Sequence, residues 1–499
     1  MIHEYVAKRN TNVRFTNNVD IMKIKRKSLV ILPIFLTLSA CTVKSEKQAE
    51  PDTAAEAPSI VEQVEIAEEV TSDEQETIED ISTPTDTVKT EVSEDEVVML
   101  NQLGHRPKDQ KLVVVRTNVE TEFSVINAAT GSSIYDGQLM DLAAGSFFAG
   151  EYKVGTFTNI TDEGNYYISC GIGDSGTFRI SDDVYGKLYQ DLLNYVKQQE
   201  IVKPESDIEA EKLIISESKA LLDLLVIYES DKDEEYRSEI LRRLDKLMEY
   251  AEDEVTYGEG DISKRALFSY AAALIRGAED LKDEESVSVD AYRERAIKVW
   301  DSITVLESLG YISDNEDYRD AAYCAAVEFY KIGEIGGGEL ADMDVNRLSG
   351  GLSENDLSGY GMFSLIDFEE GTAVSESAKK RLDVIVKDRI EMAEWDYFST
   401  SYYGGPELPK PEKVSEQGMF FFLAEKVSDD KRIPVLAKRQ LDYLLGENDE
   451  AVCYIKKYGY NTVSEETEGT RNTSLLYMLN QLDLENDAVE NEETESEEE

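Results

Sequence analysis

The sequence is poor in the residues that build most catalytic and metal centres. Among 499 residues there are 2 histidines, 2 tryptophans and 4 cysteines. The histidines are His3 and His105, so no imidazole beyond residue 105 can act as a base, nucleophile or metal ligand. Cys170, Cys324 and Cys453 are odd in number and widely spaced without a CxxC pair, which argues against a disulfide framework or a zinc site. The sequence indicates no metal and no organic cofactor.

Positive charge is scarce as well. Lysine and arginine together number 51 against 104 acidic residues, for a formal net charge of −53. Such a chain would repel phosphates, which argues against nucleic acid and against anionic membrane surfaces as partners. Much of the acidity is local, because residues 42–98 hold 18 acids against 3 lysines and residues 485–499 hold 9 acids and no base.

The N-terminal segment has the features of an export signal. Residues 22–41 read MKIKRKSLVILPIFLTLSAC, with basic residues first and then an apolar run too short to span a bilayer. The last four residues, ending in Cys41, resemble the lipobox of bacterial lipoproteins. The resemblance implies cleavage before Cys41, acylation of that cysteine and an extracytoplasmic protein anchored to the cell membrane through this lipid. The alternative is a plain signal peptide with a chance cysteine, and Met22 is the expected start of either.

Composition divides the chain into five segments. We expect residues 1–41 to be an N-terminal extension and signal peptide, and residues 42–96 to be a disordered, self-repelling acidic linker. Residues 97–181 hold short β-type runs such as Val113-Val114-Val115, separated by turn residues, which predicts a β-sandwich. Residues 184–482 show repeated apolar spacing of period 3.6 with short polar connections, which predicts a stack of helical hairpins. Residues 483–499 are expected to be a disordered acidic tail.

Two stretches resemble glycoside hydrolase family 9, the cellulase-type enzymes. Residues 101–107, NQLGHRP, resemble the NQxGYxP opening of the immunoglobulin-like domain that precedes many of its catalytic domains, with His105 where tyrosine is common. Residues 440–460 resemble the signature LDYxLGxNPxxxSYxxGxG, with Asp449 in place of proline and Cys453 in place of serine. The resemblance implies an all-β immunoglobulin-like sandwich followed by an all-α six-hairpin (α/α)6 toroid.

The same resemblance places candidate catalytic carboxyl groups. Family 9 follows the inverting scheme, in which a base activates water and an acid protonates the leaving oxygen, with the carboxyl groups roughly 6.5–9.5 Å apart. Residues 224–229, LLVIYE, resemble the helix after the family's base motif, and counting back from them puts Glu209 at the base position. The Gly-Gly-Trp-Tyr lead-in is absent, so Glu209 can equally be one more solvated acid of a helix. Asp207 is a further carboxyl group nearby.

The candidate general acid is Glu466. Residues 472–476, NTSLL, resemble the start of the family's last helix, and Glu466 lies six residues before it, at the spacing of the acid. It stands in a run of acidic residues, so the match can also be coincidental. The family's substrate loop with a Pro-His-His-Arg stretch has no counterpart between residues 460 and 466.

Aromatic residues supply a second kind of candidate site. Tyr402 and Tyr403 precede Gly404-Gly405-Pro406 in a loop that also holds Trp395. Aromatic faces stack on the C–H faces of sugar rings, so Tyr402 and Tyr403 are candidate substrate-binding residues, although they can also close the core. Trp395 is expected in the core.

Three hypotheses for function remain at this stage. The first is a surface lipoprotein derived from an endo-β-1,4-glucanase, with catalysis weakened or lost and binding of a β-glucan or related polysaccharide retained. The second is an active inverting β-glucan hydrolase that takes part in polysaccharide catabolism and uses Glu466 with Glu209 or Asp207. The third is a non-catalytic structural or interaction protein, because the family signatures report the scaffold rather than the chemistry.

Overall fold

The computed structural model describes much of the chain after the acidic linker, with side chains as far as residue 485. All described residues fall within one unit, Glu56–Glu499. The sequence candidates Cys41, Tyr402, Tyr403 and Glu466, like Trp395, lie outside the described residues. The structure describes residues 97–141, 152–251, 262–282, 287–305, 308–394, 396, 398–400, 409–463 and 472–498.

The first part is a β-sandwich. One sheet has the order β1-β3-β6, and the other has the order β2-β9-β7-β4-β5, with β8 paired to β7. Neighbouring strands are antiparallel except β2 and β9, which run parallel. The strands are β1 (Val98–Met99), β2 (Gly104–His105), β3 (Leu112–Arg116), β4 (Glu122–Asn127), β5 (Ser133–Gln138), β6 (Tyr152–Thr156), β7 (Gly164–Cys170), β8 (Gly173–Asp174) and β9 (Phe178–Ile180).

Strand β3 explains why its sequence is apolar throughout rather than alternating. Val113 and Val115 point into the core between the two sheets. Leu112 and Val114, on the opposite face, belong to the core of the helical part. Successive side chains of a strand point to opposite faces, so a strand buried on both faces needs a continuous apolar run. The sheet that contains β3 is therefore covered on both sides.

The second part is helical. Several helices begin at a serine or aspartate whose side chain accepts a backbone N–H of the first turn, as Ser206, Asp233 and Ser263 do. The helices are α1 (Gly186–Gln198), α2 (Asp207–Asp231), α3 (Glu234–Tyr250), α5 (Lys264–Asp280), α6 (Val287–Thr304), α7 (Leu309–Ser313), α8 (Arg319–Lys331), α9 (Gly337–Ala341), η3 (Val345–Arg347, a 3-10 turn), α10 (Ser358–Phe368), α11 (Ala373–Glu394), α12 (Pro411–Glu425), α13 (Arg432–Leu444) and α14 (Thr473–Glu498).

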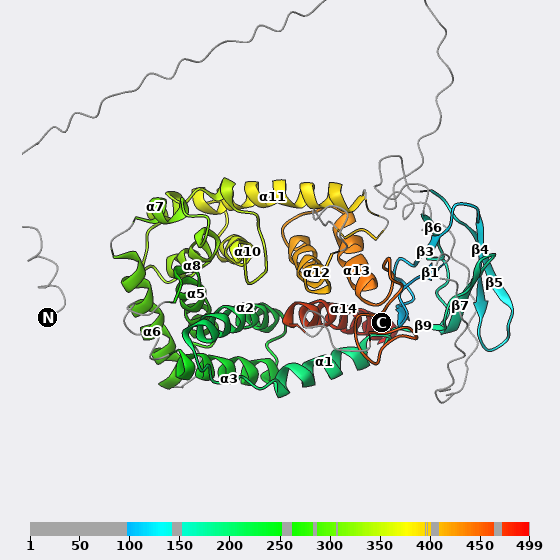
Figure 1. Ribbon diagram of the computed structural model, residues 1–499, viewed down its shortest axis with the longest axis horizontal. Helices are drawn as coiled ribbons and strands as arrows, with labels where there is room; N and C mark the ends of the chain where they lie inside the picture. The colour runs from blue at the N-terminus through cyan, green and yellow to red at the C-terminus, as the bar shows by residue number, and fades with distance from the viewer. Residues whose placement is uncertain are drawn as a thin grey trace, which may run out of the picture. The chain divides into compact units, whose positions relative to one another are not determined.

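Six of these helices form an inner ring. In order, α2, α5, α8, α10, α12 and α14 lie next to one another, and α14 packs back against α2. The remaining helices lie outside them, with α3 against α2, α6 against α5, α11 against α10 and α13 against α12, as Figure 1 shows. Every residue of α5 from Ala266 to Ala278 is buried, whereas α3 buries one face only. This contrast is expected between a helix surrounded by others and one that faces solvent.

Small residues let the inner helices approach closely. Gly361 of α10 lies so near α8 that a Cβ on it would be 3.0 Å from the Cα of Cys324. The alanines Ala271, Ala272 and Ala273 of α5 are fully buried between neighbours. The sandwich followed by a helical toroid is the fold predicted from the sequence.

The C-terminal acidic stretch differs from its prediction. Helix α14 continues through it as far as Glu498, where the sequence predicts disorder from residue 483. Glutamate favours helix, and the stretch continues a helix whose start is held by the buried residues Leu475, Leu476 and Leu479. Among the described helices, none is both long and apolar enough to cross a membrane.

Candidate functional site

The inner helices all run in the same direction, so their N-termini gather at one end of the ring. Three contacts establish this alignment. Glu211 of α2 accepts from the backbone N–H that precedes α5, Asp320 of α8 accepts from the N–H of Leu357 that precedes α10, and Asn472, just before α14, donates to Ser415 of α12. We call this the amino-terminal end of the toroid. In the sequence, the candidate acid precedes α14, which begins at this end.

Glu209 lies in the first turn of α2 at this end and is exposed. Its carboxylate accepts a hydrogen bond of 2.8 Å from the backbone N–H of Glu205, and its own N–H donates to the Ser206 hydroxyl at 3.3 Å. Ser206 is the N-cap that satisfies an N–H of the first turn, and the Glu209 carboxylate reaches back past it to the N–H of the preceding residue, close to a capping box. The position predicted for the catalytic base is thus occupied by a carboxylate engaged in capping its own helix.

Side chains meet across the axis of the toroid at the level of Asp223, which lies 16 residues beyond the start of α2, roughly 24 Å along that helix. The hydroxyl of Tyr360 on α10 donates to the carboxylate of Asp223 on α2, although these helices stand on opposite sides of the ring. Asp223 also accepts from Lys219 at 2.5 Å and from Thr473 at 2.6 Å. Asp223 is fully buried, and burial followed by the charge of Asp223 raises the pKa of Tyr360 well above its ordinary value. A fully partnered buried network of this kind fixes the helices relative to one another.

A loop before α10 adds to this filling. The backbone carbonyl of Leu352 accepts a hydrogen bond of 3.3 Å from the Tyr360 hydroxyl, and the Leu352 side chain is buried. The loop is held by Asp356, which accepts from the N–H of Gly351 and from the hydroxyl of Ser358. The interior of the ring therefore holds protein side chains at the level of Asp223.

One further carboxyl group lies near this network. Glu416, on the second turn of α12, pairs with Lys413 at 2.9 Å and keeps 15% of its side-chain surface exposed. Burial raises the pKa of Glu416, while Lys219 and Lys413 lower it. No sequence motif singled out Glu416. Across the described ranges, no group of three histidine, cysteine or acidic side chains is placed to hold a metal ion.

The helix expected after the candidate acid is present. Asn472 accepts the N–H of Leu475 at 2.9 Å and so caps α14, which is the helix start that residues 472–476 predict. Glu466 itself remains a prediction. Of the aromatic cluster around residue 400, Phe398 is described, and it is buried edge-on between Tyr152 of β6 and Tyr443 of α13.

The two family signatures contact each other. Gln102, from the first signature, donates its backbone N–H to the carbonyl of Leu445 at 2.9 Å and its side-chain amide to the carbonyl of Ala451 at 2.8 Å. Gly446 and Gly459, from the second signature, both have positive φ, and a Cβ on either would lie 2.5–2.6 Å from the Gln102 amide. Glycine at both positions is thus required by backbone conformation and by the close approach of Gln102.

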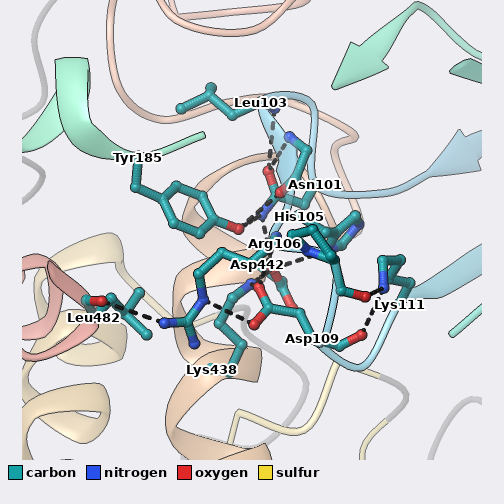
Figure 2. A network of polar contacts seen from close by, with 12 residues as sticks. Asn101, Leu103, His105, Arg106, Asp109, Lys111, Tyr185, Lys438, Asp442 and Leu482 are labelled. Atoms are coloured by element: carbon teal, nitrogen blue, oxygen red, sulfur yellow. Dashed lines mark hydrogen bonds and ion pairs between the residues drawn. The ribbon is translucent and has the colours of Figure 1, made fainter. Parts of the chain in front are cut away.

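A buried charge network completes this contact, which we call the seam between sandwich and toroid (Figure 2). Asp442 of α13 accepts from Lys438 at 2.6 Å and from Asn101 at 2.7 Å. Burial alone would lower the pKa of Lys438, but Asp442, Tyr185 and Asp109 raise it. Burial alone would likewise raise the pKa of Asp109, but Lys438 and Arg106 lower it. The Lys438 ammonium group and the Asp109 carboxylate therefore stay charged in the buried seam because each has partners of opposite charge.

Asp449, which replaces the proline of the family signature, binds residues of the sandwich. The Asp449 carboxylate accepts from Arg116 of β3 at 2.8 Å and from the hydroxyl of Tyr152 of β6. Cys453, which replaces the serine of the signature, is fully buried, and its backbone forms an isolated β-bridge with Thr462. Residues 440–460 thus form part of the contact between the sandwich and the toroid.

Comparisons with known proteins agree with this architecture. Residues 93–175 match the model of the cellulase N-terminal ig-like domain. A stretch of 118 residues is 28% identical to a xyloglucan-specific endo-beta-1,4-glucanase of Bacteroides ovatus, and it covers 24% of this chain and 20% of that enzyme. The curated relative is thus matched over about a fifth of its length.

Solved structures show the same fold over a longer range. A metagenome-derived glycoside hydrolase family 9 endoglucanase matches with a TM-score of 0.63 at 15% identity, covering 78% of this chain and 99% of its own. The enzyme AaCel9A, in complex with cellobiose-like isofagomine, matches with a TM-score of 0.59 at 17% identity, covering 73% and 85%. The chain therefore has the architecture of a cellulase-type family 9 protein, an immunoglobulin-like domain followed by an (α/α)6 toroid, which confirms the resemblance seen in the sequence.

Proposed function

We propose that this family 9-like protein is a bacterial surface lipoprotein that binds a β-glucan or related polysaccharide, with its catalytic machinery weakened or lost. Its fold matches that of a family 9 endoglucanase over 78% of this chain, which supports a role with polysaccharide. The curated relative is named as xyloglucan-specific, and AaCel9A was solved in complex with cellobiose-like isofagomine. A β-1,4-linked glucan is therefore the first ligand to test.

The observation that carries the loss of catalysis is the contact between Tyr360 and Asp223 across the ring. An inverting enzyme needs an open space between two carboxyl groups for substrate and water. Here Tyr360 and Asp223 meet across the axis of the ring, 14 residues beyond Glu209 on α2, so the interior is not open along its whole length. Glu209, at the base position, caps its own helix instead. Misplacement of a catalytic group by about 1 Å can cost orders of magnitude in rate, so both features favour binding over hydrolysis.

Tyr402 and Tyr403 are the proposed contacts to sugar rings, since they precede α12 in the sequence and α12 begins at the amino-terminal end. Replacing both by alanine is expected to weaken binding of cello-oligosaccharides by about 1–3 kcal/mol, the scale of one or two lost aromatic contacts. Tyr311, which is 61% exposed on α7, provides a matched control, because Tyr311→Ala removes a tyrosine away from the loop.

Anchoring through Cys41 is a separate part of the proposal. A metabolically incorporated fatty-acid probe is expected to label the wild-type protein in bacterial cells and to leave Cys41→Ser unlabelled. Cys170→Ser, which changes a half-buried cysteine of β7, should label like the wild type. If Cys41→Ser is labelled as strongly as the wild type, the proposed lipid anchor is refuted, and with it the proposed membrane localisation.

The deciding experiment measures binding and hydrolysis on the same samples. Full-length protein is titrated with cello-oligosaccharides and soluble β-glucans in a calorimeter, and reducing ends are then counted. We expect binding without release of reducing ends. Glu466→Gln is compared with Glu465→Gln, which changes a neighbouring acid in the same run.

Other outcomes select the other hypotheses. Hydrolysis that Glu466→Gln abolishes and Glu465→Gln preserves would make the chain an active inverting β-glucan hydrolase with a rebuilt base. Neither binding nor hydrolysis across a broad glycan panel would leave a structural or interaction protein on an inherited scaffold.

A further inference from the structure

His105 is buried in the seam without a hydrogen-bonding partner. It lies on β2, has no exposed surface, and neither ring nitrogen has a partner within hydrogen-bond distance. Its ring meets Phe157 and Phe178 edge-on, at centroid distances of 5.6 and 6.1 Å. Buried polar side chains normally have partners, so an unpartnered imidazole in a domain interface calls for an explanation.

The surroundings of His105 favour the neutral imidazole. From its own loop it faces Lys111 and Asp109, and from α13 it faces Lys438, Arg439 and Asp442.

The two acids are already engaged. Asp442 Oδ1 is 4.0 Å from the imidazole Nδ1, but it accepts from Lys438 and Asn101 at 2.6 and 2.7 Å. Asp109 pairs with Arg106 at 3.0 Å. A proton on His105 would therefore add a positive charge without a carboxylate partner of its own beside two buried lysines.

The electrostatics agree with the geometry. Burial first, and then the charges of Lys438 and Lys111, lower the pKa of His105 well below its ordinary value of 6.5, while Asp109 opposes them. Burial also lowers the pKa of Lys111, from the same loop, to about 8.

We propose that His105 makes the seam an acid-sensitive switch, in which uptake of a proton by its imidazole releases the sandwich from α13. Separation exposes the ring to water and removes the charges of Lys438 and Arg439 from its vicinity. The separated state therefore binds the proton more tightly than the docked state. By linkage, docking is fully stable above pH 6.5 and weakens as the pH falls below it, by up to about tenfold in the opening equilibrium for each pH unit.

The test follows the opening of the seam in the full-length protein by hydrogen–deuterium exchange, corrected for the intrinsic effect of pH. Peptides covering residues 98–111 and 436–449 report the seam, and peptides of α5 report the toroid. Between pH 7.5 and 5.5 we expect seam opening in the wild type to increase below pH 6.5, while α5 stays protected. His105→Phe and His105→Tyr, which cannot take up a proton there, should show little dependence on pH.

Two results would refute the switch. One is a seam opening that depends on pH equally in the wild type and in a docked His105 variant. The other is an opening of α5 together with the seam.

A second measurement covers the case in which neither variant docks at pH 7.5. In His3→Gln, His105 is the only imidazole of the chain, and its NMR signal gives its protonation directly. An imidazole that stays neutral while the seam is protected, and is protonated in the open form, supports the proposal. An imidazole that titrates near 6.5 with the seam still protected overturns it.

Discussion

Replacing Asp442 should reveal how much the seam contributes to stability. Its carboxylate lies 2.6 Å from the ammonium group of Lys438, and the side chains are 1% and 9% exposed. At an effective dielectric constant of about 20, that attraction is worth about 6 kcal/mol. Asp109, 3.5 Å from the same ammonium group, remains in Asp442→Asn and retains part of the pairing. We therefore expect Asp442→Asn to lower the free energy of unfolding by about 3–5 kcal/mol, the usual cost of leaving one buried charge without its partner.

Urea denaturation followed by tryptophan fluorescence and far-UV circular dichroism measures this loss. Glu249→Gln is the control, because Glu249 pairs with Lys246 at 2.9 Å but the two side chains are 59% and 39% exposed on α3. Exposed pairs contribute little, so no measurable change is expected there. Equal effects of the two substitutions would refute the argument, since burial is the feature that distinguishes the pairs.

Three further predictions concern the fold. Gly446 has φ +121°, and a Cβ there would lie 2.5 Å from a side-chain amide, so Gly446→Ala should lower the free energy of unfolding by about 2–3 kcal/mol. Gly333→Ala, at φ +78° in open space, should lower it by about 1–2 kcal/mol. Thermal melting measures both. Tyr360→Phe should cost about 1–2 kcal/mol in urea denaturation if its hydroxyl holds Asp223 across the ring, and an unchanged midpoint would contradict this. Burial raises the pKa of Glu425 to about 7, so its contribution to stability is present below about pH 4.5 and lost as pH rises through 7. The melting temperature of Glu425→Gln, measured between pH 5 and 8, should not show this decline in stability.

Local patterns in the sequence carried most of the architecture. Short apolar runs between turn residues predicted the strands, and the 3.6-residue spacing predicted helices such as α5, α8 and α13. These patterns record which face of each element is buried, which is a local property. They could not choose among a bundle, a solenoid and a closed ring, because that choice depends on α14 meeting α2 from the far end of the chain.

The two family signatures predicted the fold, but the sequence did not predict that they contact each other. Gln102 and Gly446 belong to recognisable motifs, yet 344 positions separate them along the chain, and only the folded structure brings them into contact. The same holds for His105. In the sequence it stands where the family motif commonly has tyrosine, and its buried, unpartnered ring is a property of the seam.

The candidate site marks the limit of the sequence most clearly. Counting residues placed Glu209 at the base position of the family motif, but its exposure and its hydrogen bond to the N–H of Glu205 depend on where α2 begins. An acid within the apolar run LLDLLVIY could have indicated that Asp223 is buried with a partner. Its partner across the ring could not be inferred, because Tyr360 is 137 residues away. The sequence by itself thus determined the elements and their order. Tertiary packing alone decided which side chains meet across the ring and at the seam, because those contacts join residues that no local pattern relates.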